Sequence, residues 1–599
     1  MSCAHISRRP QSGTSPKLSC NSTLNMSPAS QRLHAVVSTY TEAAKRFDPF
    51  YASTYNVEKD LNKFGDFPTP EYFARMKNAY KQALSALKTV DFKSLPENDR
   101  QLYRLFKEDM TVSLKGFDYP DEYLAFNQMD NRLLDYLNDS SESLTTFPFD
   151  SVKHYEDFVE RSKGLPLYVD RQIAELRRGI KKGIVLSCNI VAQVPNTYED
   201  ALEPDVEKNP FWRPMTFMPK TFSAADQMRL KAEFRKMIAT RIVPGYKKFD
   251  RFFKEEYSPH CRHGFGLASL PHAKSWYEQE ILANTNLNLT PPEIHEMGLE
   301  EVARIKGEIE AIRKQLGFKG TYKQFLASLL HDPKYFFKTR DDMFHAFERV
   351  KGETARRVPK YFSLMPKSDF KIVETSNPND AAGSYNPPTE MLPYGRFIVN
   401  TKNLRSVPIY EVTTLMLHET VPGHHFQLAL QFEMKDKLTE YQRKLFNSNS
   451  FVEGWALYAE YLGNEMGMYK DPLQRLGNLN DDMLRAVRLV VDTGIHYYGW
   501  SQARARAYMR QYLANDEKDI DNEVNRYAVW PGQALAYKLG QLKILELRHL
   551  AKRELGSKFD IKQFHAAVIG HGTVSLTELD KQVKDWIARA KTGSTAMTE

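Results

Sequence analysis

The sequence Leu-His-Glu-Thr-Val-Pro-Gly-His-His-Phe-Gln, residues 417–427, contains a His-Glu pair and two further histidines beyond a Pro-Gly step. In a regular helix, two zinc-binding histidines lie four residues apart, so that they occupy neighbouring turns of one face. His424 instead follows His418 by about 9 Å of straight helix, and His425 follows it by about 10.5 Å. Neither histidine could share a tetrahedral ion with His418 while the helix stays regular.

The Pro422-Gly423 step predicts an interruption of the helix between these histidines. Proline removes a backbone donor and clashes with the preceding turn, and glycine adopts backbone angles that other residues avoid. If two residues loop out, His424 regains the four-residue relationship with His418, whereas a bulge of another shape brings His425 to that place. We favour His424 as the second metal ligand and keep His425 as the alternative.

Residues 451–460, Phe-Val-Glu-Gly-Trp-Ala-Leu-Tyr-Ala-Glu, predict a second helix with one acidic residue at its start and another two turns later. A catalytic zinc site needs a third protein ligand and an open position for water. By itself, Glu453 is typical of an exposed first-turn acid that the helix dipole favours. The nearby His-Glu motif favours Glu453 as the third ligand, whereas Glu460 either orients a ligand histidine or faces solvent.

Glu419, the residue after His418, is predicted to be the general base of a metal-assisted hydrolysis. A carboxylate in this position can accept a proton from the attacking water and pass it to the leaving amine. The alternative is a buried structural cluster of His and Glu side chains, which is disfavoured because burying unpaired polar groups is costly. We therefore expect Zn²⁺ to be held by His418, His424 and Glu453.

In the rest of the chain, from about residue 31 onward, apolar residues recur at the three- and four-residue intervals that are typical of helices. Thr290, Pro291 and Glu293 form the pattern of a helix start with a capping box. Between residues 371 and 401, proline and glycine interrupt the pattern, and residues 395–401 alternate like a strand of a small hairpin. We predict a mainly α, large multi-helix fold with one small hairpin or sheet, and helices over residues 69–87, 154–183, 224–257, 294–316, 483–513 and 532–555.

The domain organisation predicted from the sequence is simple. Residues 1–30 are rich in serine and are interpreted as a disordered N-terminal tail. Residues 31–590 show no internal repeat and no long low-complexity linker, so we interpret them as a single helical metallopeptidase-like domain. One compact body and two lobes that share a cleft fit this pattern equally well.

The composition argues against several classes of partner. The 83 basic and 75 acidic residues are spread along the chain, so a net charge of +8 does not indicate a nucleic-acid surface. The longest apolar run, residues 183–194, is too short and too polar to span a bilayer. Four scattered cysteines predict neither a disulfide framework nor a Cys-x-x-Cys zinc site. Because no apolar signal region precedes the helices, we expect a cytoplasmic protein without a membrane partner.

Further motifs accompany residues 417–427, at residues 292–299, 383–388, 453–458, 488–496 and 530–540. Together they resemble a family of bacterial proteins long catalogued as a domain of unknown function, which is marked by a His-Glu, Pro-Gly, His-His motif. The resemblance extends through most of the chain, and the joint match is highly specific.

More distantly, the chain is similar to helical zinc peptidases of the thermophilic carboxypeptidase, thimet oligopeptidase and angiotensin-converting enzyme type. Those families bind zinc at the floor of a deep channel between two helical lobes, and the resemblance implies that fold, zinc and peptide substrates. It also implies that residues 395–401 form an edge strand that pairs with the substrate backbone. A purely structural hairpin is the alternative.

The same resemblance suggests His496 and Tyr537 as donors that stabilise a tetrahedral oxyanion. Taken alone, each is more often a packed residue with a satisfied polar tip. Arg488, Asp492 and His496 lie one turn apart, so we expect a helix-face ion pair to orient the histidine.

We predict zinc-dependent hydrolysis of peptide bonds in short peptides, with Glu419 as the general base. Charge alone makes Arg526 or Lys538 a candidate for binding a terminal carboxylate of the substrate. Two alternatives are a zinc hydrolase of a non-peptide amide or ester, and an inactive helical binding protein with a vestigial site. Metal analysis and peptide digestion separate these three functions.

Overall fold

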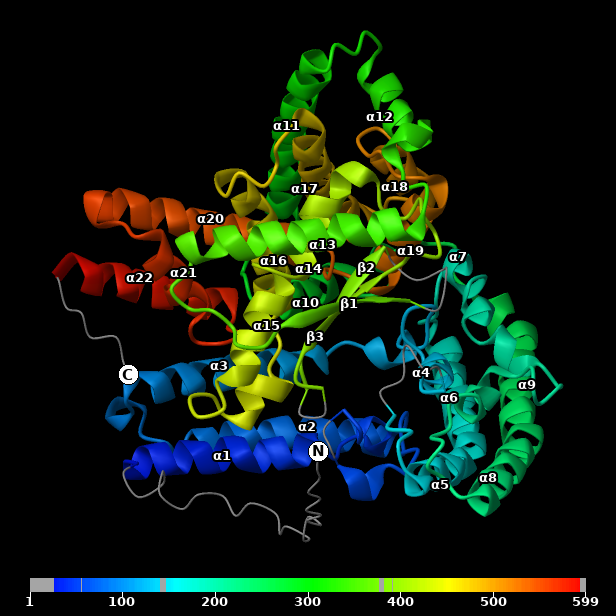
Figure 1. Cartoon of the computed structure of the whole chain (residues 1–599). Coiled ribbons are helices and arrows are strands. Elements are labelled where there is room, and N and C mark those ends of the chain that lie inside the picture. The colour runs from blue at the N-terminus through cyan, green and yellow to red at the C-terminus, as the bar shows by residue number, and fades with distance from the viewer. Residues whose placement is uncertain (1–25, 55–56, 141–146, 376–381, 390–391, 593–599) are drawn as a thin grey trace, which may run out of the picture.

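The computed structural model describes residues 26–54, 57–140, 147–375, 382–389 and 392–592. In this part of the chain the structure is mainly helical with one small three-stranded sheet (Figure 1), which confirms the predicted fold class. Residues 1–25 of the expected N-terminal tail lie outside the described residues. The first helix already begins at Pro28, inside the predicted tail, because Ser27 caps it by accepting a hydrogen bond from Ser30 N–H.

The secondary structure elements follow one another as a long series of helices, with the strands inserted between α13 and α14. Their bounds are α1 (Pro28–Ala44), α2 (Pro70–Leu87), α3 (Glu97–Gly116), α4 (Arg132–Asn138), α5 (Val152–Arg161), α6 (Leu165–Lys182), α7 (Cys188–Val191), α8 (Ala224–Met237), α9 (Val243–Phe252), α10 (Ala273–Thr285), α11 (Pro291–Gln315), α12 (Tyr322–His331), α13 (Arg340–Arg357), β1 (Phe370–Glu374), β2 (Gly383–Asn386), β3 (Gly395–Val399), α14 (Val412–Glu419), α15 (His424–Glu433), α16 (Asn449–Glu465), α17 (Pro472–His496), α18 (Gln502–Met509), α19 (Glu517–Val529), α20 (Leu535–Leu555), α21 (Ile561–Ile569) and α22 (Leu576–Thr592).

Local sequence signals explain where several helices begin. Thr290 and Glu293 form the predicted capping box at the start of α11, in which the Glu293 carboxylate accepts the Thr290 N–H at 2.8 Å. Two predicted long helices are interrupted instead. A short turn at Ser162–Gly164 divides residues 154–183 into α5 and α6, and α17 ends at His496, shortly before Gly499 with its positive φ of 70°.

The strands form one sheet in the order β1-β3-β2, with β3 parallel to β1 and antiparallel to β2. β3 is therefore the central strand, and the expectation that residues 395–401 form a free edge strand is wrong. The sheet packs between α13 and α14, where Phe347 and Phe397 place their rings 5.3 Å apart. The free edges belong to β1 and β2.

Two large hydrophobic cores organise the helices, and each core combines early and late parts of the chain. One core joins α5, α6, α8 and α9 to α17 and α19. The other joins α1, α2 and α3 to α15, α16, α20, α21 and α22. Figure 1 shows α1, α2 and α3 lying together beside the C-terminal helices. The prediction of two lobes around a channel stays a prediction.

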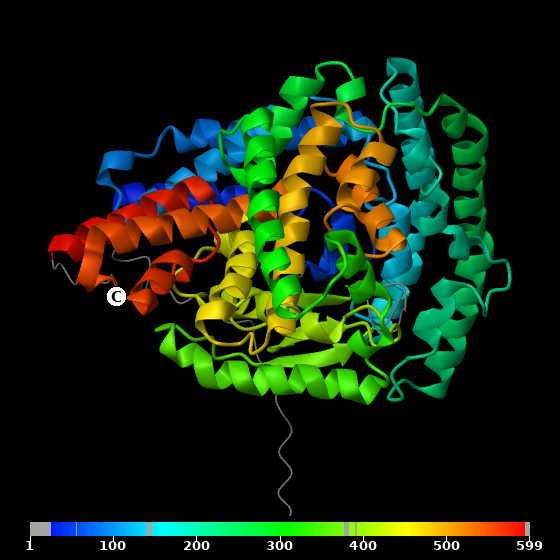
Figure 2. The same ribbon diagram turned by 90° about the horizontal axis from the view of Figure 1, so that it is seen from above.

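Small residues allow two pairs of long helices to approach closely. Along α11 and α17, which run side by side in Figure 2, a side chain at Gly298 would meet Leu489 and Val490. α16 and α20 cross where Gly454 faces Gly540, and a Cβ atom on Gly540 would lie 1.9 Å from the Ser450 carbonyl oxygen. The second crossing positions the helix that carries Glu453.

Cys188 and Cys261, separated by 73 residues, form a disulfide bond, although the scattered cysteines predicted no disulfide framework. Backbone contacts accompany the bond, because the Cys188 N–H donates to the Arg262 carbonyl at 2.9 Å. The pairing could not be read from spacing, since it depends on the tertiary approach of α7 to the segment after α9.

Replacing Gly540 with alanine tests the tight crossing of α16 and α20. The new Cβ would overlap backbone atoms, so we expect the free energy of unfolding to fall by about 2–3 kcal/mol in chemical denaturation. Gly307→Ala is the matched control, because no atom lies within 4 Å of a Cβ at this exposed position in α11. There the free energy should rise by about 0.5–1 kcal/mol. An equal change in the free energy of unfolding for the two variants would contradict the tight crossing of α16 and α20.

Candidate metal centre

The predicted interruption between the histidines is present. α14 ends at Glu419 and α15 begins at His424, and Thr420 leaves the helical region with φ −118° and ψ −106°. Two backbone hydrogen bonds hold the connection, from Thr420 N–H to the Met416 carbonyl at 3.0 Å and from Phe426 N–H to the Thr420 carbonyl at 3.2 Å. The chain therefore turns back within a few residues, instead of bulging inside a continuous helix.

Gly423 is required for this turn because the chain passes directly over the end of α14. A Cβ at Gly423 would lie 1.9 Å from the His418 carbonyl oxygen and 2.3 Å from the Leu417 carbonyl oxygen. From the other side, the indole N–H of Trp455 in α16 donates to the Pro422 carbonyl at 2.8 Å. The turn is thus clamped between two helices that carry the candidate ligands.

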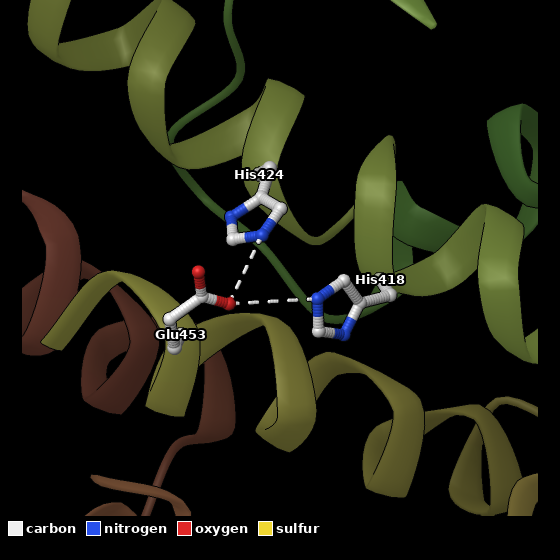
Figure 3. A group of neighbouring side chains, drawn as sticks. All are labelled: His418, His424 and Glu453. Carbon is white, nitrogen blue, oxygen red and sulfur yellow. Dashed lines mark ion pairs between the residues drawn. The ribbon is translucent and has the colours of Figure 1, made fainter. Parts of the chain in front are cut away.

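His418, His424 and Glu453 come together as the sequence predicted for a metal site (Figure 3). The Glu453 Oε2 atom lies 3.6 Å from His418 Nε2 and 3.4 Å from His424 Nε2. One ligand atom from each of the three residues lies within 4.8 Å of the other two. Both histidines are buried and the glutamate is largely buried, so solvent does not screen the group.

The chemistry of this group fits zinc. Imidazole nitrogen and carboxylate oxygen bind zinc at about 2.0–2.2 Å, which places neighbouring ligands of a tetrahedron about 3.4 Å apart. The separations from Glu453 Oε2 to the two histidines match that spacing. Glu453 Oε2 is also a buried atom with no hydrogen-bond partner in the described residues. A buried carboxylate oxygen without a donor is costly, and a cation removes that cost.

Glu460 orients His418 from behind, which decides between its two predicted roles. Its Oε1 atom lies 2.7 Å from His418 Nδ1, and its Oε2 atom accepts a hydrogen bond from the Thr414 hydroxyl at 2.8 Å. Glu460 is fully buried, so it does not face solvent. The hydrogen bond leaves Nε2 of His418 directed toward Glu453, as is usual for histidines that bind metals.

The carboxylates control the protonation of the ligand histidine. Burial opposes a charge on His418, but Glu453 and Glu460 outweigh burial and raise its pKa to about 10. Burial likewise opposes the charge on Glu453, yet His424 and His418 hold its pKa well below the ordinary value. Because a metal binds neutral imidazole, a metal ion at this place would compete with a proton on His418.

His425 lies outside this group, although it directly follows His424. Its Nε2 donates to the Ser368 carbonyl at 3.1 Å, so its Nδ1 accepts the hydrogen bond from the Tyr385 hydroxyl at 2.8 Å. Burial lowers the pKa of His425 to about 4. The structure therefore uses His425 to tie α15 to the sheet, and His424 faces Glu453.

Glu419 is the last residue of α14 and is half-buried. Within the described residues its carboxylate takes part in no hydrogen bond or ion pair. Its charge contributes to the raised pKa of His418, so it lies near the metal group. The side chain is thus available to a water molecule or a substrate.

Tyr537 lies on α20, three residues before the glycine that crosses α16 next to Glu453. Three residues span about 4.5 Å along the helix axis, so Tyr537 lies less than one turn from the crossing. Its hydroxyl accepts a hydrogen bond from Arg526 Nη2 at 3.0 Å, and no acceptor for its own proton lies within range among the described residues. Tyr537 can donate that proton to a bound group.

His496 does not belong to the candidate site, and the prediction that it contacts substrate is wrong. It is fully buried, its Nδ1 accepts the Leu267 N–H at 3.1 Å, and its Nε2 donates to the Tyr527 carbonyl at 2.9 Å. Burial lowers its pKa to about 3. Both nitrogens are committed to the backbone, so His496 packs α17 against its neighbours.

The structure also contradicts the predicted partners of three charged residues, Arg488, Asp492 and Lys538. Arg488 pairs with Glu523 at 2.7 Å and makes no ion pair with Asp492. Asp492 instead accepts hydrogen bonds from the Tyr277 hydroxyl and the Gly532 N–H. Lys538 is fully buried and forms ion pairs with Glu301 at 2.8 Å and Asp482 at 2.6 Å. Its charge is therefore already balanced, and a substrate carboxylate cannot reach it.

A cavity of about 490 Å³ lies beside the N-terminal end of α16. Its lining includes Asn449, one turn before Glu453 on α16, and Gln533, which accepts a hydrogen bond from Arg526. Asp121 and Glu280 line its inner part, and burial raises the pKa of Asp121 to about 6 and raises that of Glu280. The candidate ligands His418, His424 and Glu453 are not among the residues that line this cavity.

Sequence reasoning missed several supporting residues. Thr414 precedes His418 by one turn on the same helix face, a spacing that could have suggested its contact with Glu460. Tyr385 and Trp455 lie in segments that carry the family resemblance, but nothing in their spacing pointed to His425 or to the turn. Their contacts depend on the tertiary structure.

The chain belongs to a known family. The family model described as bacterial protein of unknown function (DUF885) matches residues 49–583, which is most of the chain. No curated protein is significantly similar to it in sequence.

Two solved structures share the fold. A "putative lipoprotein" from Colwellia psychrerythraea is 24% identical, with a TM-score of 0.87 over 94% of this chain and 99% of that chain. A "putative lipoprotein of unknown function" from Shewanella oneidensis is 18% identical, with a TM-score of 0.69 over 92% of this chain and 99% of that chain. At these identities the similarity shows the fold alone.

These two structures contradict the expectation of a cytoplasmic location, because both are described as lipoproteins. The bond between Cys188 and Cys261 agrees with the correction, since disulfides persist in oxidising compartments and are rare in the cytosol. Among the described residues, none of the helices combines the length and the apolar character needed to cross a bilayer.

Replacing Gly423 with alanine tests the turn that brings the histidines together. The added methyl group would collide with the His418 carbonyl, so the turn must open and separate His424 from Glu453. We expect Zn²⁺ affinity, measured by titration against a chelating dye, to fall by more than about 10-fold. Gly352→Ala in α13, where the nearest atom is an arginine tip at 3.8 Å, should leave the affinity unchanged. Unaltered affinity in Gly423→Ala would argue against the assigned turn.

Proposed function

We propose that this protein is a zinc-dependent hydrolase that cleaves peptide bonds in short peptides. The observation that carries the proposal is the convergence of His418 and His424 on Glu453, with the unpaired carboxylate of Glu419 beside them. Two histidines and one glutamate are a ligand set of catalytic zinc sites, which keep a fourth position for water or substrate. The choice of a peptide substrate rests on the resemblance of the sequence motifs to those of helical zinc peptidases, which no comparison tests.

A bound zinc ion supplies Lewis acidity, which activates water and polarises a carbonyl group. Glu419 accepts the proton of the attacking water and delivers it to the leaving nitrogen, which completes the cleavage of the amide. The carboxylate can do this because no partner in the described residues competes for it. Glu460 keeps His418 in one orientation while charge develops at the site.

Tyr537 is proposed to stabilise the oxyanion that forms on the carbonyl oxygen. The Arg526 guanidinium donates to the Tyr537 oxygen, so the tyrosine proton is directed away from Arg526 and stays free for the substrate. A hydroxyl held in advance stabilises developing charge without reorganisation. His496, the other candidate in the sequence, has no free nitrogen for this role.

The location proposed for this activity is an oxidising compartment outside the cytoplasm. Support comes from the disulfide between Cys188 and Cys261 and from the lipoprotein descriptions of the two similar structures. Short, unstructured peptides are the proposed substrates, and the cavity beside α16 can accept one side chain of such a peptide.

Replacing Glu419 with glutamine separates the general base from the metal site. The amide keeps the size of the side chain but cannot accept the proton, so peptide cleavage should fall by at least about 1,000-fold while bound zinc stays near one ion per chain. His418→Ala should lose both zinc and activity. Cleavage is measured by mass spectrometry of peptide digests, with and without a chelator, and zinc by elemental analysis.

Glu546→Gln is the matched control, because Glu546 is an exposed carboxylate on α20 with a surface ion pair. This variant should retain both zinc and activity. Full activity of Glu419→Gln would remove the assigned base, and a wild-type protein without zinc or cleavage would remove the proposed function.

Replacing Tyr537 with phenylalanine tests the oxyanion donor. The ring keeps its packing against Arg488, at 4.5 Å from the guanidinium carbon, and only the hydroxyl is lost. We expect kcat to fall by about 100-fold with little change in KM or in the melting temperature. A fall of less than about 3-fold in kcat would exclude Tyr537 from the reaction.

A further inference from the structure

Two arginines enclose the ring of Tyr537. Arg488 on α17 lies against one part of the ring, with its guanidinium carbon 4.5 Å from the centroid, and Arg526 on α19 lies at 5.8 Å. Arg526 Nη2 also donates to the Tyr537 hydroxyl at 3.0 Å. Three helices therefore bring two cations to the residue that is proposed to contact the reacting carbonyl.

These arginines share a single carboxylate. Glu523 accepts from Arg488 Nη2 at 2.7 Å and from Arg526 Nη1 at 3.3 Å. Burial opposes its charge, but the two guanidinium groups lower the pKa of Glu523 to about 2. The nearby Arg485 is balanced by Asp481 at 2.6 Å. One positive charge of the Arg488 and Arg526 pair is left without a counter-ion in the described residues.

Unused hydrogen-bond donors accompany this excess charge. Arg488 is 4% exposed, and its Nη1 atom has no hydrogen-bond partner. The Nε atom of Arg526 also has none. Burying a cation without a counter-ion costs free energy, and so does burying a hydrogen-bond donor without an acceptor. A carboxylate removes both costs, because its two oxygens match the geometry of a guanidinium group.

Arg526 gives a ligand access to this pair. Its side chain is 19% exposed, compared with 5% for Arg488. Its partner Gln533 lines the cavity that also includes Asn449, one turn before Glu453. An anion that approaches from solvent therefore reaches Arg526 first, and its charge balances the excess positive charge of the two arginines.

We propose that Arg526 and Arg488 form a subsite for the terminal carboxylate of a peptide, so that the enzyme removes one or two residues from the C-terminus. The inference rests on the proposed function, in which the Tyr537 hydroxyl contacts the scissile carbonyl oxygen. Three hydrogen bonds of about 3 Å each would join the scissile carbonyl oxygen to Tyr537, Tyr537 to Arg526, and Arg526 to the carboxylate, so the carboxylate lies within about 9 Å of that oxygen. That distance spans one or two residues but not three, at about 3.3–3.6 Å per residue.

The first test measures binding without turnover, using zinc-loaded Glu419→Gln protein and isothermal titration calorimetry. Three probes are compared: acetyl-trialanine with a free carboxylate, the same peptide as its C-terminal amide, and an amide whose last residue is glutamate. We expect the free acid to bind about 10- to 100-fold more tightly than the alanine amide. Equal affinity of acid and amide, or no binding of either, overturns the subsite. Tight binding of the glutamate amide alone would assign the arginines to an acidic side chain and overturn the terminal specificity.

The second test assigns the arginine. In Arg526→Gln, the preference for acid over amide should fall to near one, whereas Arg526→Lys should keep part of it because the charge remains. Arg510→Gln is the control, because Arg510 forms an exposed ion pair with Glu517, and it should bind like the parent. Melting temperatures exclude unfolding, and an unchanged preference in folded Arg526→Gln overturns the assignment.

Active wild-type protein provides a third readout, the products of digestion. The subsite predicts release of free terminal amino acids or of C-terminal dipeptides, and internal cleavage or release from the N-terminus overturns it. If the binding preference holds but no peptide is cleaved, the proposed function fails while the carboxylate subsite stands. If peptides are cleaved with equal rates for acids and amides, the subsite fails while the proposed function stands.

Discussion

The close approach of the Pro422-Gly423 turn to the end of α14 is the constraint on which the candidate site depends. The backbone at Gly423 leaves no room for a side chain against the His418 carbonyl, and Trp455 holds the Pro422 carbonyl from the opposite helix. Because the turn folds back here, His424 faces the same carboxylate as His418, although six positions separate the two histidines. The His425 side chain is then directed to the sheet, where it secures α15.

Much of the fold and the core of the site could be predicted from the sequence, because those signals are local. The capping pattern at Thr290 depends only on its next three residues, and the spacing of His418 and His424 forced an irregular backbone at a Pro-Gly step. Glu453 followed from the chemistry of a third ligand. The capping box and the turn each lie within one short segment, whereas Glu453 lies on another helix and was chosen for its chemistry and not for its position.

The features that could not be predicted depend on contacts between distant segments. From the sequence, His496 and Tyr537 were equally suitable as hydrogen-bond donors to an oxyanion. Only the fold shows that the backbone of Leu267 and of Tyr527 occupies both nitrogens of His496. The central position of β3 depends on β1 pairing in parallel with it, and a short alternating strand does not reveal how many neighbours it has. The bond from Cys188 to Cys261 likewise required the tertiary approach of two segments.

Each of the two hydrophobic cores combines early and late parts of the chain, and this limits the order in which the protein can fold. α1, α2 and α3 contact one another, but they also pack against α20, α21 and α22, so the first helices to be synthesised lack these partners until almost the whole chain exists. Contacts between such distant segments are slow to form, and unpacked apolar surfaces invite aggregation or chaperone binding. The candidate metal ligands lie on helices of this core, so the candidate site takes shape only near the end of folding.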